Sequence, residues 1–243
     1  MEPDRIVIEP MAEPFILWRC LHRGPLSPAS IEQWPSGDGL PWPTFRARNL
    51  PLPKKLVATY GTCAMLARDG EQVVGFLRFY PKAIASLEEA GGLCLQQASP
   101  AGPSARLVEM RFPPLEEMPD KVLTVHCLMS GSPQQERNPY QRQGIGTRLV
   151  QALAAWARAE GGQAIEATAY EDLSIIYAVT GQAGKRFWEK LGFQLVRTET
   201  EPDFAQEDEF ADFVKALREQ AGEQGMDFEQ AKNRYTMRLE LTA

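Results

Sequence analysis

One glycine-containing loop constrains this 243-residue chain more than any other segment. It follows a strand-like run that ends near Ser130, it opens a helix-like run, and it reads Gln141, Arg142, Gln143, Gly144, Ile145, Gly146, Thr147 and Arg148. Two glycines at a helix start let the backbone turn with no side chain in the way, so successive N–H groups can face one concavity. Because first-turn N–H groups lack an intrahelical partner and the helix dipole adds positive charge, the loop predicts a diphosphate site.

Two other phosphate-binding loops fit this spacing poorly. The loop of nucleoside-triphosphate proteins needs a lysine directly after its second glycine, and no lysine follows Gly146. A dinucleotide loop needs a third small residue where this chain has Leu149. The spacing therefore favours a different diphosphate ligand.

Two phrases resemble a known family. The pattern Gln-x-x-Gly-x-Gly at residues 141–146 resembles the acyl-coenzyme A loop of the GNAT acetyltransferase superfamily. Residues 187–193, Phe-Trp-Glu-Lys-Leu-Gly-Phe, resemble the phrase with which these proteins end a short helix at glycine and open the next strand. Each phrase is weak alone, and their order, with one helix and one strand between them, indicates the family.

The resemblance implies an α+β, three-layer fold of GNAT type. Its sheet would be mixed, mostly antiparallel and twisted, with a central splayed parallel strand pair and helices on both faces. Residues 56–243 would form the acyl-CoA-binding domain, with insertions at 81–119 and 201–233. Residues 1–55, rich in proline and tryptophan, would add a helix near 13–22 and an irregular segment that forms part of the acceptor wall.

Hydrophobic periodicity predicts the elements of that domain. A hairpin is expected at 63–67 and 73–80, and residues 106–112 fit an added strand. The run 122–129 reads as a central strand paired with a strand at 164–170. Further elements are expected as helices at 146–160, 183–191 and 206–221 and as strands at 193–198 and 235–241.

Composition argues against several classes of protein. Hydrophobic content of 44% and charged content of 24% are ordinary for a soluble domain, and no run reaches membrane-spanning length. A net charge of −6 argues against nucleic acid as a partner. Residues 1–5 lack the basic start of a secretion signal, which favours the cytoplasm. The widely spaced Cys20, Cys63, Cys94 and Cys127 predict reduced thiols and no metal.

The resemblance also implies a reaction. An N-acetyltransferase of this family moves an acetyl group from acetyl-CoA, its co-substrate, to a primary amine by direct attack in a ternary complex. The acceptor could be a small molecule or a protein. Residues 141–148 would hold the pyrophosphate of coenzyme A, and a main-chain N–H at Leu128 or Met129 would meet the acyl oxygen.

The incoming amine must lose a proton, and three residues are candidates for that step. Glu171 directly follows the expected strand at 164–170, although a solvated loop carboxylate would look the same. His126 titrates in the right range, and its mid-strand position equally fits a hydrogen-bonded core histidine. Tyr170 fits either a substrate-orienting hydroxyl or an aromatic side chain that lines the wall.

One departure from the family pattern concerns catalysis. Many members carry a tyrosine where this chain has Trp188, and an indole N–H is too weak an acid to reprotonate the departing thiolate. Water, Tyr177 or Tyr170 remain as proton sources. The alternative function is a non-catalytic module that binds or senses acyl-CoA. The apolar stripe at 210–217 fits either core packing or a homodimer contact.

Overall fold

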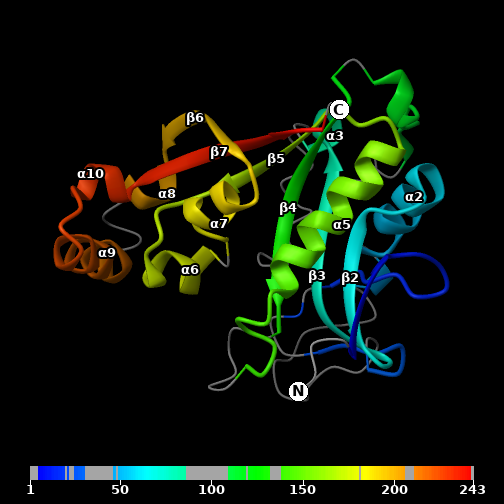
Figure 1. Ribbon diagram of the computed structural model, residues 1–243, viewed down its shortest axis with the longest axis horizontal. Coiled ribbons are helices and arrows are strands. Elements are labelled where there is room, and N and C mark those ends of the chain that lie inside the picture. The colour runs from blue at the N-terminus through cyan, green and yellow to red at the C-terminus, as the bar shows by residue number, and fades with distance from the viewer. Residues whose placement is uncertain are drawn as a thin grey trace. The chain divides into compact units, whose positions relative to one another are not determined.

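The computed structural model forms two compact units, residues 1–163 and residues 164–243, which are described separately below (Figure 1). The structure describes residues 5–19, 21, 25–30, 46–47, 49–85, 109–118, 120–131, 138–180, 182–205 and 211–241.

The first unit is built on four antiparallel strands. They follow one another in the order β1 (Ile6–Pro10), β2 (Ala64–Asp69), β3 (Gln72–Pro81) and β4 (Val122–Ser130). The predicted hairpin is confirmed as β2 and β3, which turn at Gly70. Both strands are buried along almost their whole length, as expected of strands covered on two faces.

The start of the chain differs from the prediction. Residues 6–10 form β1, which pairs with β2 from Ile6 opposite Asp69 to Pro10 opposite Met65. The helix expected at 13–22 is wrong, because residues 13–19 form a turn and irregular backbone. The physical reason is burial: Phe15, Ile16, Leu17 and Trp18 are all buried, whereas a surface helix buries one stripe.

Helix α5 (Ile145–Ala159) confirms the helix predicted at 146–160 and packs on the sheet of the first unit. Its buried stripe consists of Ile145, Leu149, Val150, Leu153, Ala154 and Ala157. The same unit holds α2 (Pro51–Tyr60), α3 (Lys82–Ala85) and the 3-10 helix η4 (Leu115–Glu117). In the insertion expected at 81–119, residues 86–108 lie outside the described residues, and 109–112 form no strand.

The second unit has three antiparallel strands, with β7 (Asn233–Glu240) between β5 (Ala164–Ala169) and β6 (Gln194–Thr200). The predicted strands at 164–170, 193–198 and 235–241 are thereby confirmed within one or two residues. Helix α7 (Lys185–Lys190) is shorter than expected, and α6 (Ser174–Thr180) was not predicted. The unit also holds α8 (Pro202–Ala205), α9 (Ala211–Glu223) and α10 (Phe228–Ala231).

The described part of the apolar stripe expected at 210–217 lies in the core of the second unit. Val214 and Leu217 of α9 are buried, and Leu217 packs with Tyr170, Ile176 and Phe204 in one cluster. Residues 206–210 lie outside the described residues. The predicted α+β class with a mostly antiparallel sheet is confirmed, since every strand pair described within a unit is antiparallel.

Candidate functional site

The glycine loop of the first unit has the backbone conformation that its sequence predicts. Gly144 is the N-cap of α5 in the left-handed region, with φ of 72°, and no side chain caps the helix. Beyond it, the first main-chain N–H with an intrahelical acceptor is that of Arg148, which donates to Gly144 O at 3.0 Å. The N–H groups of Ile145, Gly146 and Thr147 therefore stand at the positive end of the helix without an intrahelical partner.

Two side chains hold the loop against the strands of the same unit. The amide of Asn138 donates to the carbonyl of Ser130 at 2.9 Å, and its oxygen accepts from the main-chain N–H of Tyr140 at 3.0 Å. The Tyr140 hydroxyl lies 3.3 Å from Asp69 Oδ2 and donates to it. Burial and the neighbouring Asp69 charge raise the pKa of Tyr140, so this hydroxyl keeps its proton.

A close approach between β3 and α5 fixes the helix start. A Cβ atom at Gly75 would lie 3.0 Å from Ile145 Cγ2 and 3.0 Å from the carbonyl oxygen of Met129. Glycine at this position therefore allows the first turn of α5 to pack beside the end of β4.

The side chains of the loop divide into two groups. Gln141 and Arg142 are exposed. Gln143 donates its amide to the carbonyl of Pro139, and Arg148 donates Nη2 to the carbonyl of Ile6 at 2.6 Å. An anion at the loop would therefore contact the exposed side chains and the first-turn N–H groups.

The end of β4 carries three of the predicted site residues. Met129 is buried opposite Phe76, and Leu128 is half-buried opposite Leu77. His126 is the additional residue of a β-bulge, because its neighbours Val125 and Cys127 face consecutive residues of β3. Its half-buried ring contacts Tyr80 edge-on, with centroids 5.4 Å apart.

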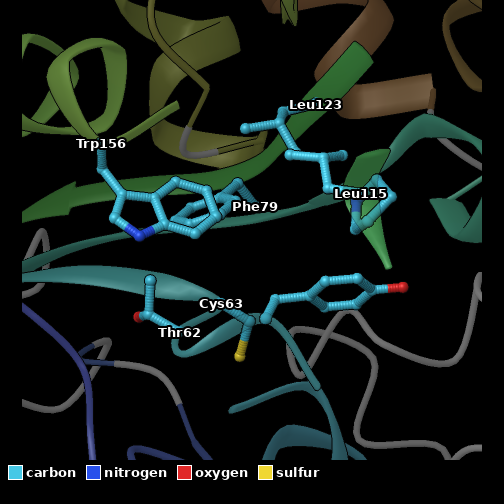
Figure 2. Close-up of a pocket in the computed structure, with 8 residues that line it drawn as sticks. Thr62, Cys63, Phe79, Leu115, Leu123 and Trp156 are labelled. Carbon is cyan, nitrogen blue, oxygen red and sulfur yellow. The ribbon is translucent and has the colours of Figure 1, made fainter. Parts of the chain in front are cut away.

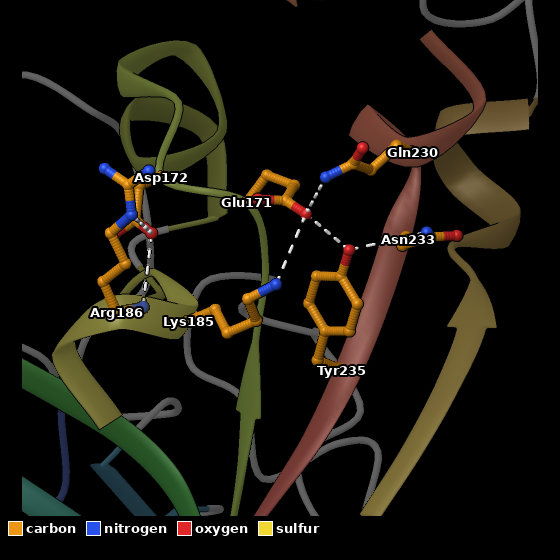
Figure 3. A network of polar contacts seen from close by, with 7 residues as sticks. All are labelled: Glu171, Asp172, Lys185, Arg186, Gln230, Asn233 and Tyr235. Carbon is orange, nitrogen blue, oxygen red and sulfur yellow. Dashed lines mark hydrogen bonds and ion pairs between the residues drawn. The ribbon is translucent and has the colours of Figure 1, made fainter. Parts of the chain in front are cut away.

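In the second unit, Glu171 is a buried carboxylate rather than a solvated loop charge (Figure 3). Its Oε1 accepts hydrogen bonds from Tyr235 Oη at 2.6 Å and Gln230 Nε2 at 2.9 Å. Lys185 Nζ lies 3.8 Å from the same oxygen. Burial, followed by the hydrogen bond to Glu171, raises the pKa of Tyr235 to about 12.

Tyr170 takes part in a separate buried contact of the second unit. Its hydroxyl donates to Glu201 Oε2 at 2.8 Å, and Arg234 Nη1 lies 3.4 Å from the same oxygen. Burial first, then the hydrogen bond to Glu201, raise the pKa of Tyr170, so the proton stays on the hydroxyl.

Part of the chain matches a protein family. Residues 137–195, which include the loop, Tyr170 and Glu171, match the family model described as Acetyltransferase (GNAT) domain. This segment of the chain is therefore similar to an acetyltransferase domain.

Solved structures similar to the chain are also acetyltransferases by their titles. A GNAT family acetyltransferase from Elizabethkingia anophelis with acetyl-CoA bound has 14% identity and a TM-score of 0.40 over 98% of this chain and 99% of its own. An IAA acetyltransferase from Bacillus cereus has 13% identity and a TM-score of 0.39 over 97% and 99%. Ard1 from Thermoplasma volcanium has 13% identity and a TM-score of 0.39 over 78% and 77%. At such scores these likenesses carry no argument. None of the curated proteins matches the chain significantly.

Trp188 lies in α7, inside the segment that matches the acetyltransferase model. It is 1% exposed and packs edge-on against Phe187 and Phe193, with ring centroids 5.1 and 4.9 Å away. The indole is therefore a packing residue of the second unit.

Sequence reasoning missed the residues that surround Glu171. Tyr235 and Gln230 lie about sixty positions later in the chain, on β7 and α10. The sequence marks Tyr235 only as part of an alternating strand. The one signal for a role near Glu171 is its place on β7, where it pairs with Ala169 at the end of β5.

An apolar hollow of the first unit adds no reactive group to the candidate site (Figure 2). Its polar members are already paired: Tyr60 donates to the carbonyl of Pro113 and Thr62 to that of Ala64. Burial raises the pKa of the Cys63 thiol to about 12, which keeps it from acting as a thiolate nucleophile.

The described residues contain no helix long and apolar enough to span a membrane, and no group of three or more potential metal ligands.

Proposed function

We propose that this protein is an N-acetyltransferase that moves an acetyl group from acetyl-CoA to a primary amine of a small molecule or a protein. The observation that carries the proposal is the left-handed Gly144 at the start of α5, which leaves three first-turn N–H groups without an intrahelical partner. It lies inside the segment that matches an acetyltransferase domain. A diphosphate fits such a helix start, which supports acetyl-CoA as co-substrate.

In this proposal the first unit holds the acyl donor. The main chain of residues 144–147 binds the pyrophosphate, and the exposed Gln141 and Arg142 flank it. Arg148 and Gln143, whose side chains bind carbonyls, support the loop. A main-chain N–H at Leu128 or Met129 stabilises the negative charge that develops on the acyl oxygen.

The reaction is a direct attack. The amine nitrogen forms a bond to the thioester carbon as the carbon–sulfur bond breaks, the amine loses one proton, and the thiolate leaves. Glu171 is our first candidate for accepting that proton, because its Oε2 has no partner among the described residues. His126 in the bulge of β4 is the second candidate. Tyr170 is kept as an orienting residue, since its hydroxyl is bound to Glu201.

Return of a proton to the thiolate falls to water or Tyr177 in this proposal. Trp188 is buried among aromatic rings and supplies no acidic group. Tyr177 of α6 is 40% exposed, which supports it as a proton donor that solvent can reload. A coenzyme A thiolate is stable enough near neutral pH to leave before it is protonated.

A pair of variants at one position tests the diphosphate site. Thr147→Asp puts a carboxylate in the first turn of α5, where it stabilises the helix by about 0.3–1 kcal/mol but repels a diphosphate. Thr147→Asn has the same shape without the charge. We expect acetyl-CoA, and neither ATP nor NAD, to raise the unfolding temperature of the parent protein and of Thr147→Asn, but not of Thr147→Asp. Equal shifts in both variants would disprove the proposed diphosphate site.

The alternative function is an acyl-CoA-binding module without turnover, and the missing tyrosine at position 188 favours it. A panel of primary amines with acetyl-CoA and detection of released thiol separates the two. We expect Glu171→Gln to lower kcat while the acetyl-CoA-induced thermal shift is kept. Binding without thiol release from any amine would support the module.

We also propose a cytoplasmic location and a homodimer. The buried thiol of Cys63, which forms no disulfide, supports a reducing compartment. Leu195 and Val196 of β6, which are 47% and 53% exposed, support a contact between two copies. Sedimentation of the parent protein and of Val196→Asp tests the proposed homodimer.

A further inference from the structure

We propose that Tyr235 is the positioning residue of the Glu171 carboxylate, an inference that rests on the proposed acetyl transfer. The three donors near Glu171 come from three separate elements, β7, α7 and α10, and all lie beside one oxygen. Tyr235 Oη is 2.6 Å, Gln230 Nε2 2.9 Å and Lys185 Nζ 3.8 Å from Oε1 (Figure 3). Tyr235 makes the shortest of these contacts.

The second oxygen of Glu171 is left available. No described residue donates to Oε2, and Oε2 is not among the fully buried polar atoms that lack a partner. It therefore keeps access from outside the protein although the whole residue is 7% exposed. A carboxylate fixed through one oxygen presents the other in a defined direction, which suits proton acceptance from an ammonium group.

The Tyr235 hydroxyl remains a hydrogen-bond donor to Glu171 at neutral pH. Its pKa is raised to about 12, chiefly by burial and next by its hydrogen bond to Glu171, so the hydroxyl is protonated at neutral pH. Lys185 Nζ lies 4.8 Å from the centre of the Tyr235 ring, and Asn233 Nδ2 lies 3.5 Å from the Tyr235 hydroxyl. These contacts hold the ring in place beside the carboxylate.

The direction of the effect follows from the donor. A hydrogen bond to a carboxylate favours its charged form, which is the form that accepts a proton. Tyr235→Phe removes that donor and the 3.5 Å contact between the hydroxyl and Asn233 Nδ2, and phenylalanine keeps the ring. The carboxylate in the variant should therefore be less well oriented, so kcat should fall while acetyl-CoA binding is kept.

The same unit offers a matched comparison. Tyr170 donates to Glu201 at 2.8 Å, so Tyr170→Phe removes a buried tyrosine–glutamate hydrogen bond of the same kind. It leaves the three donors of Glu171 in place. We use it as the control for stability and for the acetyl-CoA-induced thermal shift, not for activity.

The experiment compares the steady-state kinetics of the parent protein, Tyr235→Phe and Gln230→Leu. We expect kcat to fall about tenfold in Tyr235→Phe and by a smaller factor in Gln230→Leu, with KM for acetyl-CoA and the acetyl-CoA-induced thermal shift unchanged. Tyr235→Phe added to Glu171→Gln should cause no further fall in kcat, because the two changes remove one interaction.

Two other outcomes would overturn the inference. An unchanged kcat in both Tyr235→Phe and Gln230→Leu overturns the positioning role. A further fall in kcat when Tyr235→Phe is added to Glu171→Gln shows that Tyr235 acts apart from Glu171, and the inference falls. Failure of the proposed function itself is seen in the parent protein alone, as no acetyl-CoA-induced thermal shift and no thiol release.

Discussion

The guanidinium of Arg148 in α5 donates a hydrogen bond to the main-chain carbonyl of Ile6 in β1, with 2.6 Å between Nη2 and the oxygen. The first turn of the helix that carries the glycine loop is thereby attached to the first strand of the same unit. Arg148 therefore supports the scaffold of the loop, and the main chain of residues 144–147 remains to meet a diphosphate.

Arg148→Ala should therefore lower stability more than it lowers affinity for acetyl-CoA. Loss of a charge-assisted hydrogen bond that leaves a carbonyl unpaired costs about 1.5–3 kcal/mol of unfolding free energy. Arg158→Ala is the control, because it removes an exposed arginine from the same helix. Urea unfolding measures the first effect and calorimetric titration with acetyl-CoA the second. A large loss of affinity with unchanged stability would assign Arg148 to the ligand instead.

The two ends of α5 offer a second matched test. Gly144 and Gly161 have φ of 72° and 73°, and a Cβ atom at either meets nothing within 4 Å. Alanine at each site should cost about 1–2 kcal/mol, since both positions are left-handed. Only Gly144→Ala should also weaken acetyl-CoA binding, because its Cβ enters the proposed diphosphate concavity. Thermal shifts with and without ligand distinguish the two, and equal loss of binding in both would count against the loop.

How far the sequence predicted this protein depends on the range of the interactions. The glycine loop, α5 and the β2–β3 hairpin follow from local rules of turn geometry and periodicity. β1 was missed because a five-residue strand at a sheet edge has too short a pattern, and its pairing with β2 lies almost sixty residues away. The wrong helix at 13–22 reflects tertiary burial of four consecutive apolar side chains.

The candidate site shows the same division. Glu171 could be singled out because it directly follows a strand, which is local information. Its partners Gln230 and Tyr235 come from sequence positions about sixty residues away, and no spacing rule joins them. Burial of Glu171 follows from those partners and was therefore not predictable.

A further prediction concerns the start of α7, where Asp172 lies beside Arg186 (Figure 3). Asp172 Oδ2 accepts from the main-chain N–H of Arg186 at 3.2 Å, and a Cβ atom at Gly184 would lie 2.2 Å from Asp172 Oδ1. Gly184→Ala should displace the carboxylate and cost about 1 kcal/mol, as loss of a helix cap does. Asp172→Ala should cost a similar amount. Because both changes remove one interaction, the double variant should lose less than the sum of the two. Additive losses in urea unfolding would show that the contact is independent of the cap.

The last prediction concerns alkaline stability and Tyr235. Its folded-state pKa of about 12 lies above the ordinary value of 10.0. A raised pKa means that the folded protein holds the proton after the unfolded chain has lost it. The stabilisation is therefore fully present below pH 10 and is lost as the pH rises from 10 towards 12. In that window the free energy of unfolding should fall more steeply for the parent protein than for Tyr235→Phe, which has no phenol to titrate. The difference between the two curves should change by on the order of 2 kcal/mol. Urea unfolding at pH 8, 10 and 11 measures both curves, and parallel curves would show that Tyr235 titrates normally in the folded protein.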